Sequence, residues 1–136
     1  MKDIATLLAQ SETTIAVVGA SDNPEKYGNV IYRDLKGKGF TTYPINKDRD
    51  TVDGDKAYPS LRDLPEKPTI VNIVVPPRAA LRVLEDCRDL GLDNIWLQPG
   101  AESPEVMSAL EAGNFNYLAN ACIMVESRGK SGASEQ

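Results

Sequence analysis

The sequence contains no histidine, and this absence excludes whole classes of function. Histidine is the commonest general base and the commonest metal ligand in proteins. A Ser-His-Asp or Cys-His catalytic site within this chain is therefore excluded. The two cysteines, Cys87 and Cys122, do not have the spacing of metal ligands. We expect no metal site and no catalytic residues, and we expect no disulfide in a chain that we predict to be cytoplasmic.

Basic residues are also in deficit, with 15 Lys and Arg against 20 Asp and Glu, which gives a net charge of −5. Proteins that bind nucleic acids normally carry a basic stripe, so we predict no nucleic-acid partner. No apolar run approaches the about 20 residues of a membrane span, and the N-terminus has no secretory or transit pattern. The expectation is a cytoplasmic protein without a membrane partner. Its 136 residues suit one domain with one hydrophobic core.

The sequence does contain a regular alternation of apolar, β-forming runs with amphipathic segments. Strands are predicted at residues 14–19, 40–45, 69–75, 94–98 and 115–119, and helices at residues 4–9, 27–38, 76–91 and 103–113. This alternation predicts an α/β fold, a Rossmann-like doubly wound parallel sheet of five strands in three α/β/α layers. We assign the domain to residues 1–126. The polar, Gly/Ser-rich residues 127–136 are predicted to form a disordered tail.

Ligands of such sheets bind at the carboxyl ends of the strands, near the point where the strand order reverses. Four segments of this chain should meet there. The expected site residues are Gly19, Ala20, Ser21, Asp22, Asn23, Pro24 and Lys26 after the first strand, Asn46 and Lys47 after the second, Val75, Pro76 and Pro77 after the third, and Gln98 and Gly100 after the fourth.

The first and second segments carry the most specific signals. Gly19 permits a sharp turn into a helix whose first N–H groups attract a pyrophosphate. The full G-x-G-x-x-G pattern is absent, because the next glycine is Gly28, so a simple tight turn is also compatible. NAD-binding domains place an acid near the end of the second strand, where this chain has Lys47. A lysine suits a ribose that carries a phosphate, which leaves both CoA and NADP open.

The other segments are less specific. Pro76-Pro77 makes a stiff wall that can pack on a nucleotide, and it also suits the start of a helix. Gln98 stands at a strand end, where its side chain can hydrogen-bond a ligand amide. Cys87 lies on the apolar face of its helix and is interpreted as a core residue. Cys122 has no assigned role, since a reactive thiol needs a lowered pKa that the sequence does not reveal.

Taken together, these segments resemble the CoA-binding domain family, a small Rossmann-like module also found at the start of the succinyl-CoA synthetase alpha subunit. The resemblance runs from about Thr14 to Glu126. It is carried by residues 15–21 with Asn23 and Pro24, by residues 43–47, by Gly54 with residues 57–61, and by residues 95–100.

The resemblance implies coenzyme A or an acyl-CoA as the ligand rather than NADP. By the same resemblance, the turn from Gly19 to Pro24 holds the CoA phosphates, and Lys47 meets the phosphorylated ribose or the adenine end. Residues 75–77 flank the nucleotide, while Gln98 and Gly100 close the site.

The chain departs from the synthetase in one respect that bears on function. The synthetase reaction passes through a phosphorylated histidine in a further domain, and this chain has no histidine. We therefore expect a CoA-binding carrier, sensor or regulatory module without catalysis of its own. The alternatives are an NADP- or NAD-binding redox module, or a subunit of a multi-chain acyl-CoA synthetase. A homo-oligomer and a synthetase-like partner chain both stay open.

Overall fold

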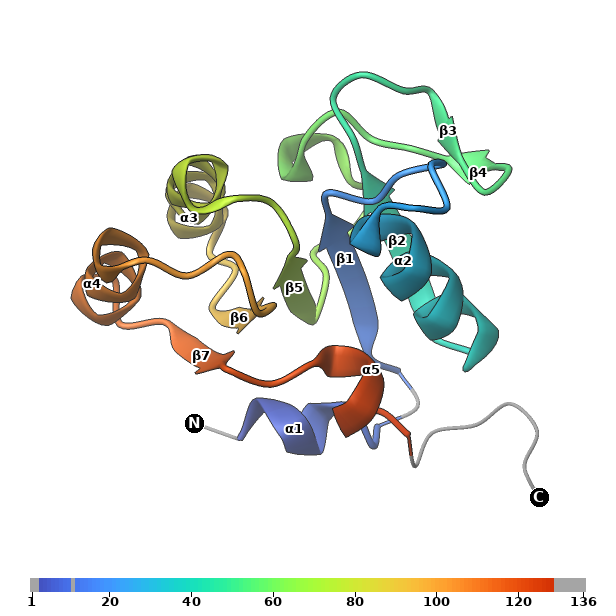
Figure 1. Ribbon diagram of the computed structural model, residues 1–136. Coiled ribbons are helices and arrows are strands. Elements are labelled where there is room, and N and C mark those ends of the chain that lie inside the picture. The colour runs from blue at the N-terminus through green and yellow to red at the C-terminus, as the bar shows by residue number, and fades with distance from the viewer. Residues whose placement is uncertain (1–2, 11, 129–136) are drawn as a thin grey trace.

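A parallel five-stranded sheet forms the centre of the protein in the computed structural model, which describes residues 3–10 and 12–128 (Figure 1). The strand order is β2-β1-β5-β6-β7, and every neighbouring pair is parallel. The strands are β1 (Thr14–Val18), β2 (Thr41–Ile45), β5 (Ile70–Ile73), β6 (Asn94–Leu97) and β7 (Asn116–Ala119). The predicted Rossmann-like α/β fold is confirmed, with a strand in each of the five expected places.

Helices cover both faces of this sheet (Figure 1). Figure 1 shows α1, α2 and α5 on one side and α3 and α4 on the other. Their bounds are α1 (Ile4–Leu7), α2 (Tyr27–Gly37), α3 (Pro77–Leu90), α4 (Pro104–Ala112) and α5 (Ile123–Glu126), with a short 3₁₀ turn, η1 (Leu61–Asp63). Along β1, Ala16 and Val18 pack into one core while Ile15 and Val17 pack into the other. Because both faces are buried, β1 is a continuous apolar run rather than an alternating one.

The strand order fixes where a ligand can bind. The chain leaves β1 through α2 toward the edge strand β2, and it leaves β5 through α3 in the opposite direction. The helices that follow these adjacent strands therefore lie on opposite faces, which opens a crevice between the two strand ends. Segments that are distant in the sequence meet at this crevice.

Local signals explain where the helices begin and end. The Asp3 carboxylate accepts the N–H of Ala5 at the start of α1, and the Ser103 hydroxyl does the same for Val106 at the start of α4. The α3 helix ends at Gly91, whose φ of 74° favours glycine. None of the helices in residues 3–10 and 12–128 is both long and apolar enough to cross a bilayer.

Two sequence predictions about the helices need correction. The sequence pattern of residues 27–38 places Val30, Ile31 and Leu35 on one helix face, but Val30 is 40% exposed. The buried face instead contains Ile31, Tyr32 and Leu35, which follow helical spacing, and Val30 points away from them. The short helix α5 was not predicted, because four residues are too few to show a period.

The loop and tail predictions also change. The sequence predicts a charged loop at residues 47–56 with a turn at Asp53-Gly54, and this loop contains a hairpin, β3 (Thr51–Val52) and β4 (Asp55–Lys56), around that turn. Both turn residues have positive φ, as a type I′ hairpin turn requires. Ser127, assigned to the tail, is buried and accepts a hydrogen bond from Lys38 Nζ, so it belongs to the fold. The rest of the predicted tail, from residue 129, lies outside the described residues.

The hairpin is joined to α2 through Asp55, which predicts a pH dependence of stability. Lys36 Nζ lies 2.7 Å from the Asp55 carboxylate and the Tyr32 hydroxyl donates to it at 2.6 Å. Lys36 first, and Tyr32 second, hold the pKa of Asp55 below its usual value. A lowered folded-state pKa stabilises the fold above the unfolded pKa, and this contribution is lost as the pH falls through the folded value.

We therefore expect the melting temperature of the wild type to fall more steeply on acidification below about pH 4 than that of Asp55→Asn. Thermal melts across this range, followed by circular dichroism, measure the difference. Parallel curves for the two proteins would show that Asp55 does not make this contribution.

Candidate ligand-binding site

A pocket of about 380 Å³ lies where the carboxyl ends of β1 and β2 meet η1 and α3. Its wall is largely apolar, formed by side chains that include Val18, Ile45, Leu61 and Val75. These residues come from four separate elements or their ends, and the strand order brings them together. The pocket therefore occupies the crevice that the topology opens.

The glycine turn after β1 forms one side of this pocket. Gly19 has a φ of 104°, and a Cβ placed on it would lie 3.0 Å from Val75 Cγ1. Its N–H donates to the carbonyl of Ile45 at 3.1 Å, which ties the turn to the end of β2. Glycine is required here both by the backbone conformation and by the close approach of Val75. The start of α2 opens on the same turn, where helix N–H groups attract anions.

Side chains hold the turn in shape. Asn46 Nδ2 donates to the carbonyl of Ala20 at 2.8 Å, and Asn29 Nδ2 donates to the carbonyl of Ser21 at 2.9 Å. The Ser21 hydroxyl in turn accepts the N–H of Asn23. Asn46 lines the pocket, and this contact makes it a positioning residue for the turn as well.

Two cations reach the pocket from different elements. Lys47 follows β2, Arg82 projects from α3, and both are exposed. Within the described residues, neither forms an ion pair with an acidic side chain. The two acids at the pocket are Asp48 and Asp86, and Arg62 lies 3.0 Å from the Asp86 carboxylate. The charges of Lys47 and Arg82 are therefore available to an anionic ligand.

The structure brings some of the predicted site residues to the pocket and leaves others outside it. Gly19, Asn46, Lys47 and Val75 line the pocket. The exposed turn residues Asn23, Pro24 and Lys26 lie beyond its lining, and Ala20 is buried beneath the turn.

Three further predicted residues serve the ends of secondary-structure elements. Pro76 precedes α3 and Pro77 is its first residue, which is the expected helix start. Asp22 faces the β3–β4 hairpin, where it accepts the N–H of Asp53 at 2.6 Å. None of the three is part of the pocket lining.

Gln98 and Gly100 lie on the β6 side of the same sheet edge. Gln98 is 1% exposed, and its Oε1 accepts the N–H of Ile123 at 3.2 Å and Asn72 Nδ2 at 3.3 Å. Gly100 is exposed with a φ of 103°, and its N–H donates to Glu102. Neither residue lines the pocket, and Gln98 is held in the interior beneath α5.

The contribution of α3 and η1 to the pocket was not predicted from the sequence. Ala79, Arg82, Val83 and Asp86 line the pocket from α3, and residues 59–61 line it from the start of η1. The four α3 residues are three or four positions apart and so share one helix face. This spacing is the signal by which the pocket-lining face of α3 could have been predicted. The neighbouring apolar positions instead indicated only the face of the helix that packs on the core.

The sheet topology defines a Rossmann-like α/β protein with a pocket at the switch point of its strand order. Residues 13–128 match the CoA binding domain family, and the chain belongs to this family. The resemblance stated from the sequence is thereby confirmed.

Individual relatives agree with this assignment. A solved structure, a conserved hypothetical protein from Pyrococcus furiosus, is 45% identical with a TM-score of 0.81, and the match covers 84% of this chain and 98% of that one. The uncharacterized protein YneT of Bacillus subtilis is 26% identical over 118 residues, 87% of each chain. The alpha subunit of ADP-forming acetate–CoA ligase II from Pyrococcus furiosus is 35% identical over 82 residues. That match covers 60% of this chain but only 18% of the ligase subunit.

Proposed function

We propose that this chain binds coenzyme A, or an acyl-CoA, with the nucleotide end in the pocket at the ends of β1 and β2. The observation that carries the proposal is the pair of cations, Lys47 and Arg82, at the rim of an otherwise largely apolar pocket. An apolar wall suits the adenine ring, and two cations suit a phosphate on the ribose. Membership of the CoA binding domain family supports the same ligand.

The turn after β1 is the proposed position of the pyrophosphate. Gly19 allows the backbone to approach a ligand closely, and α2 begins just beyond the turn with its N–H groups directed toward it. Asn46 fixes the turn from the end of β2 through its bond to Ala20. The nucleotide would thus be held by backbone donors at one side and by Lys47 at the other.

We further propose that the protein acts as a carrier, sensor or regulatory module and has no catalytic residues of its own. The polar side chains that line the pocket are those of Asn46, Lys47, Asp48, Ser60, Arg82 and Asp86. This set suits recognition of an anion, and it contains no histidine because the whole sequence has none.

Isothermal titration calorimetry with CoA tests the binding proposal directly. We expect saturable binding, and we expect CoA to raise the melting temperature more than NADP or NAD does, because a ligand that binds only the folded state stabilises it. A folded protein that gives no binding heat and no thermal shift at millimolar CoA would overturn the proposal. A larger shift with NADP would favour the redox-module alternative instead.

A second candidate is a subunit of a multi-chain acyl-CoA synthetase. The 35% identity to the acetate–CoA ligase alpha subunit favours it, because that protein is itself one chain of a ligase. Copurification of the tagged chain from its native host, with assay of the purified material for acid- and CoA-dependent nucleotide turnover, tests this candidate. Recovery of the chain alone, without such activity, would count against it.

A further inference from the structure

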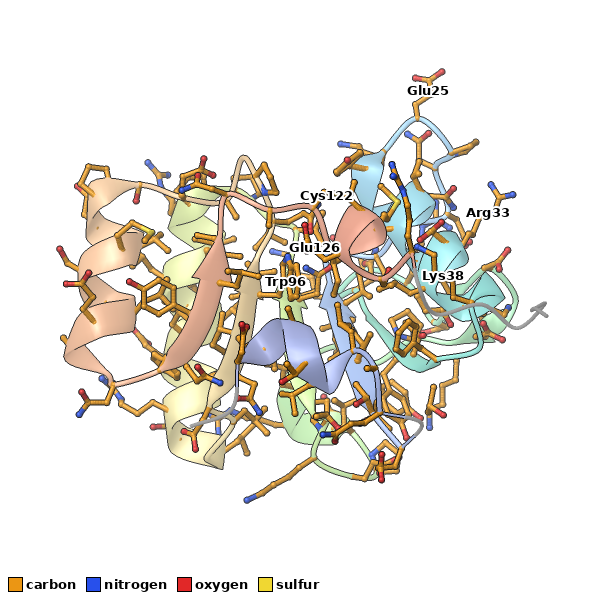
Figure 2. The ribbon with its side chains drawn as sticks, turned by 90° about the horizontal axis from the view of Figure 1, so that it is seen from below. Glu25, Arg33, Lys38, Trp96, Cys122 and Glu126 are labelled. Carbon is orange, nitrogen blue, oxygen red and sulfur yellow. The ribbon has the colours of Figure 1, made fainter. Side chains whose placement is uncertain are left out.

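Cys122 occupies a distinctive place at the carboxyl edge of the sheet. It directly precedes α5, beside α2, and is half-buried (Figure 2). Its Sγ lies 3.5 Å from the hydroxyl of Tyr27, the first residue of α2. The other cysteine, Cys87, is fully buried on the core-facing side of α3. Only Cys122 is therefore placed to react with a molecule bound at the strand ends.

A second observation points to this sulfur from inside the protein. Gln98 ends β6 and is 1% exposed. While its Oε1 accepts two hydrogen bonds, its Nε2 has no oxygen or nitrogen acceptor among the described residues. The Gln98 amide interacts with the Cys122 thiol and lowers its pKa. A buried donor without a conventional partner is unfavourable, and a thiolate or another sulfur at this place would satisfy it.

The surroundings of the two thiols shift their pKa values in opposite directions. Partial burial alone raises the pKa of the Cys122 thiol. Hydrogen bonds from the Tyr27 hydroxyl, the Gln98 amide and the N–H groups of Met124 and Val125 outweigh this effect, and the pKa lies below the usual thiol value. Burial raises the pKa of Cys87 to about 12. Cys122 therefore has the larger fraction of reactive thiolate at neutral pH.

The turn after β1 connects this thiol to the pocket. Gly19, at the start of the turn, lines the pocket, and Tyr27, directly after its end, contacts Cys122. CoA is elongated, with the nucleotide at one end and a thiol at the end of the pantetheine arm. A nucleotide in the pocket with its pyrophosphate on the turn would direct that arm along the edge on which Cys122 lies.

We propose that Cys122 forms a mixed disulfide with the thiol of CoA, by exchange with a disulfide of CoA. The proposal rests on the proposed CoA binding. In this step the Cys122 thiolate attacks one sulfur of the CoA disulfide, a bond forms between the two sulfurs, and the original sulfur–sulfur bond breaks. One CoA leaves as a thiolate and takes up the proton that Cys122 lost. The product retains CoA covalently and is released by a reducing thiol.

Intact-protein mass spectrometry after incubation with CoA disulfide tests this inference. We expect one CoA adduct per chain, reversed by dithiothreitol, in the wild type and in Cys87→Ala, and no adduct in Cys122→Ser. Because binding of the nucleotide makes the exchange effectively intramolecular, the adduct should form roughly tenfold or more faster with CoA disulfide than with glutathione disulfide. Adenosine 3′,5′-bisphosphate, which has no thiol, should slow the first reaction and leave the second unchanged.

The outcomes separate this inference from the proposed function. Suppose that calorimetry shows CoA binding to both the wild type and Cys122→Ser, but no adduct forms on the wild type. This result overturns the mixed disulfide and leaves the binding proposal intact. Equal rates with CoA disulfide and glutathione disulfide also overturn it, because Cys122 would then be only an accessible thiol. Absence of CoA binding by calorimetry overturns the proposed function first.

Discussion

We expect Lys47→Ala to weaken CoA binding by roughly ten- to a hundredfold, the range for a lost hydrogen bond to a charged group at about 1.5–3 kcal/mol. Lys47 lies at the rim of the pocket with no acidic ion-pair partner in the part of the chain that the structure describes. Its removal should therefore delete a contact to the proposed ligand without breaking an ion pair among the described residues.

The assignment of Lys47 to the ribose phosphate is tested by the choice of ligand. Dephospho-CoA lacks that phosphate, so its affinity should change by no more than about twofold in the same variant. The CoA affinity of the wild type should also fall with added salt, because an exposed contact is screened. Calorimetry with both ligands measures the difference.

Two further variants sharpen this test. Lys47→Arg keeps the charge and should retain part of the affinity. Lys67→Ala removes another exposed lysine, one that precedes β5 at the opposite end of the strands, and it should leave CoA binding unchanged. Equal losses for CoA and dephospho-CoA in Lys47→Ala would show that Lys47 does not contact the phosphate.

The fold could be predicted from the sequence because its strands are buried on both faces. The continuous apolar run of β1 and the similar run of β5 have few alternative interpretations in a chain of this length. The carboxyl ends of those strands follow directly, and with them the pocket positions of Gly19, Lys47 and Val75. Local sequence is sufficient for these three residues, because they follow β1, β2 and β5, the strands that border the pocket.

The rest of the site depends on contacts between distant segments. Arg82 reaches the pocket because α3 packs against η1, and no local pattern distinguishes it from a solvated arginine. Gln98 was expected to meet the ligand, but α5 folds over it and the N–H of Ile123 occupies its oxygen. Because α5 has only four residues, its presence could not be inferred, and neither could the burial of Gln98.

Gly28 was noted in the sequence only as the next glycine after Gly19, yet the structure gives it a large expected effect. A Cβ on Gly28 would lie 1.9 Å from the carbonyl oxygen of Gly19 and 3.3 Å from the Cα of Ala20. These neighbours are backbone atoms of the turn, so no side-chain movement can relieve the overlap. Gly28→Ala must displace α2 from the turn.

We expect Gly28→Ala to lower the free energy of unfolding by about 1–3 kcal/mol or more, as overpacking in a buried contact does. Its CoA affinity should fall as well, because the turn and the start of α2 form the proposed pyrophosphate site. Urea denaturation measures the first effect, followed by the fluorescence of Trp96, which is the only tryptophan and is fully buried. Calorimetry measures the second.

Gly37→Ala is the matched control within the same helix. No atom lies within 4 Å of a Cβ placed on Gly37. Alanine is the better helix former by about 1 kcal/mol, so this variant should be at least as stable as the wild type and bind CoA equally well. The two Gly→Ala substitutions in α2 are therefore expected to change stability in opposite directions. If Gly28→Ala were as stable as Gly37→Ala and bound CoA as tightly, the close contact between α2 and the glycine turn would not be needed for either the fold or the proposed site.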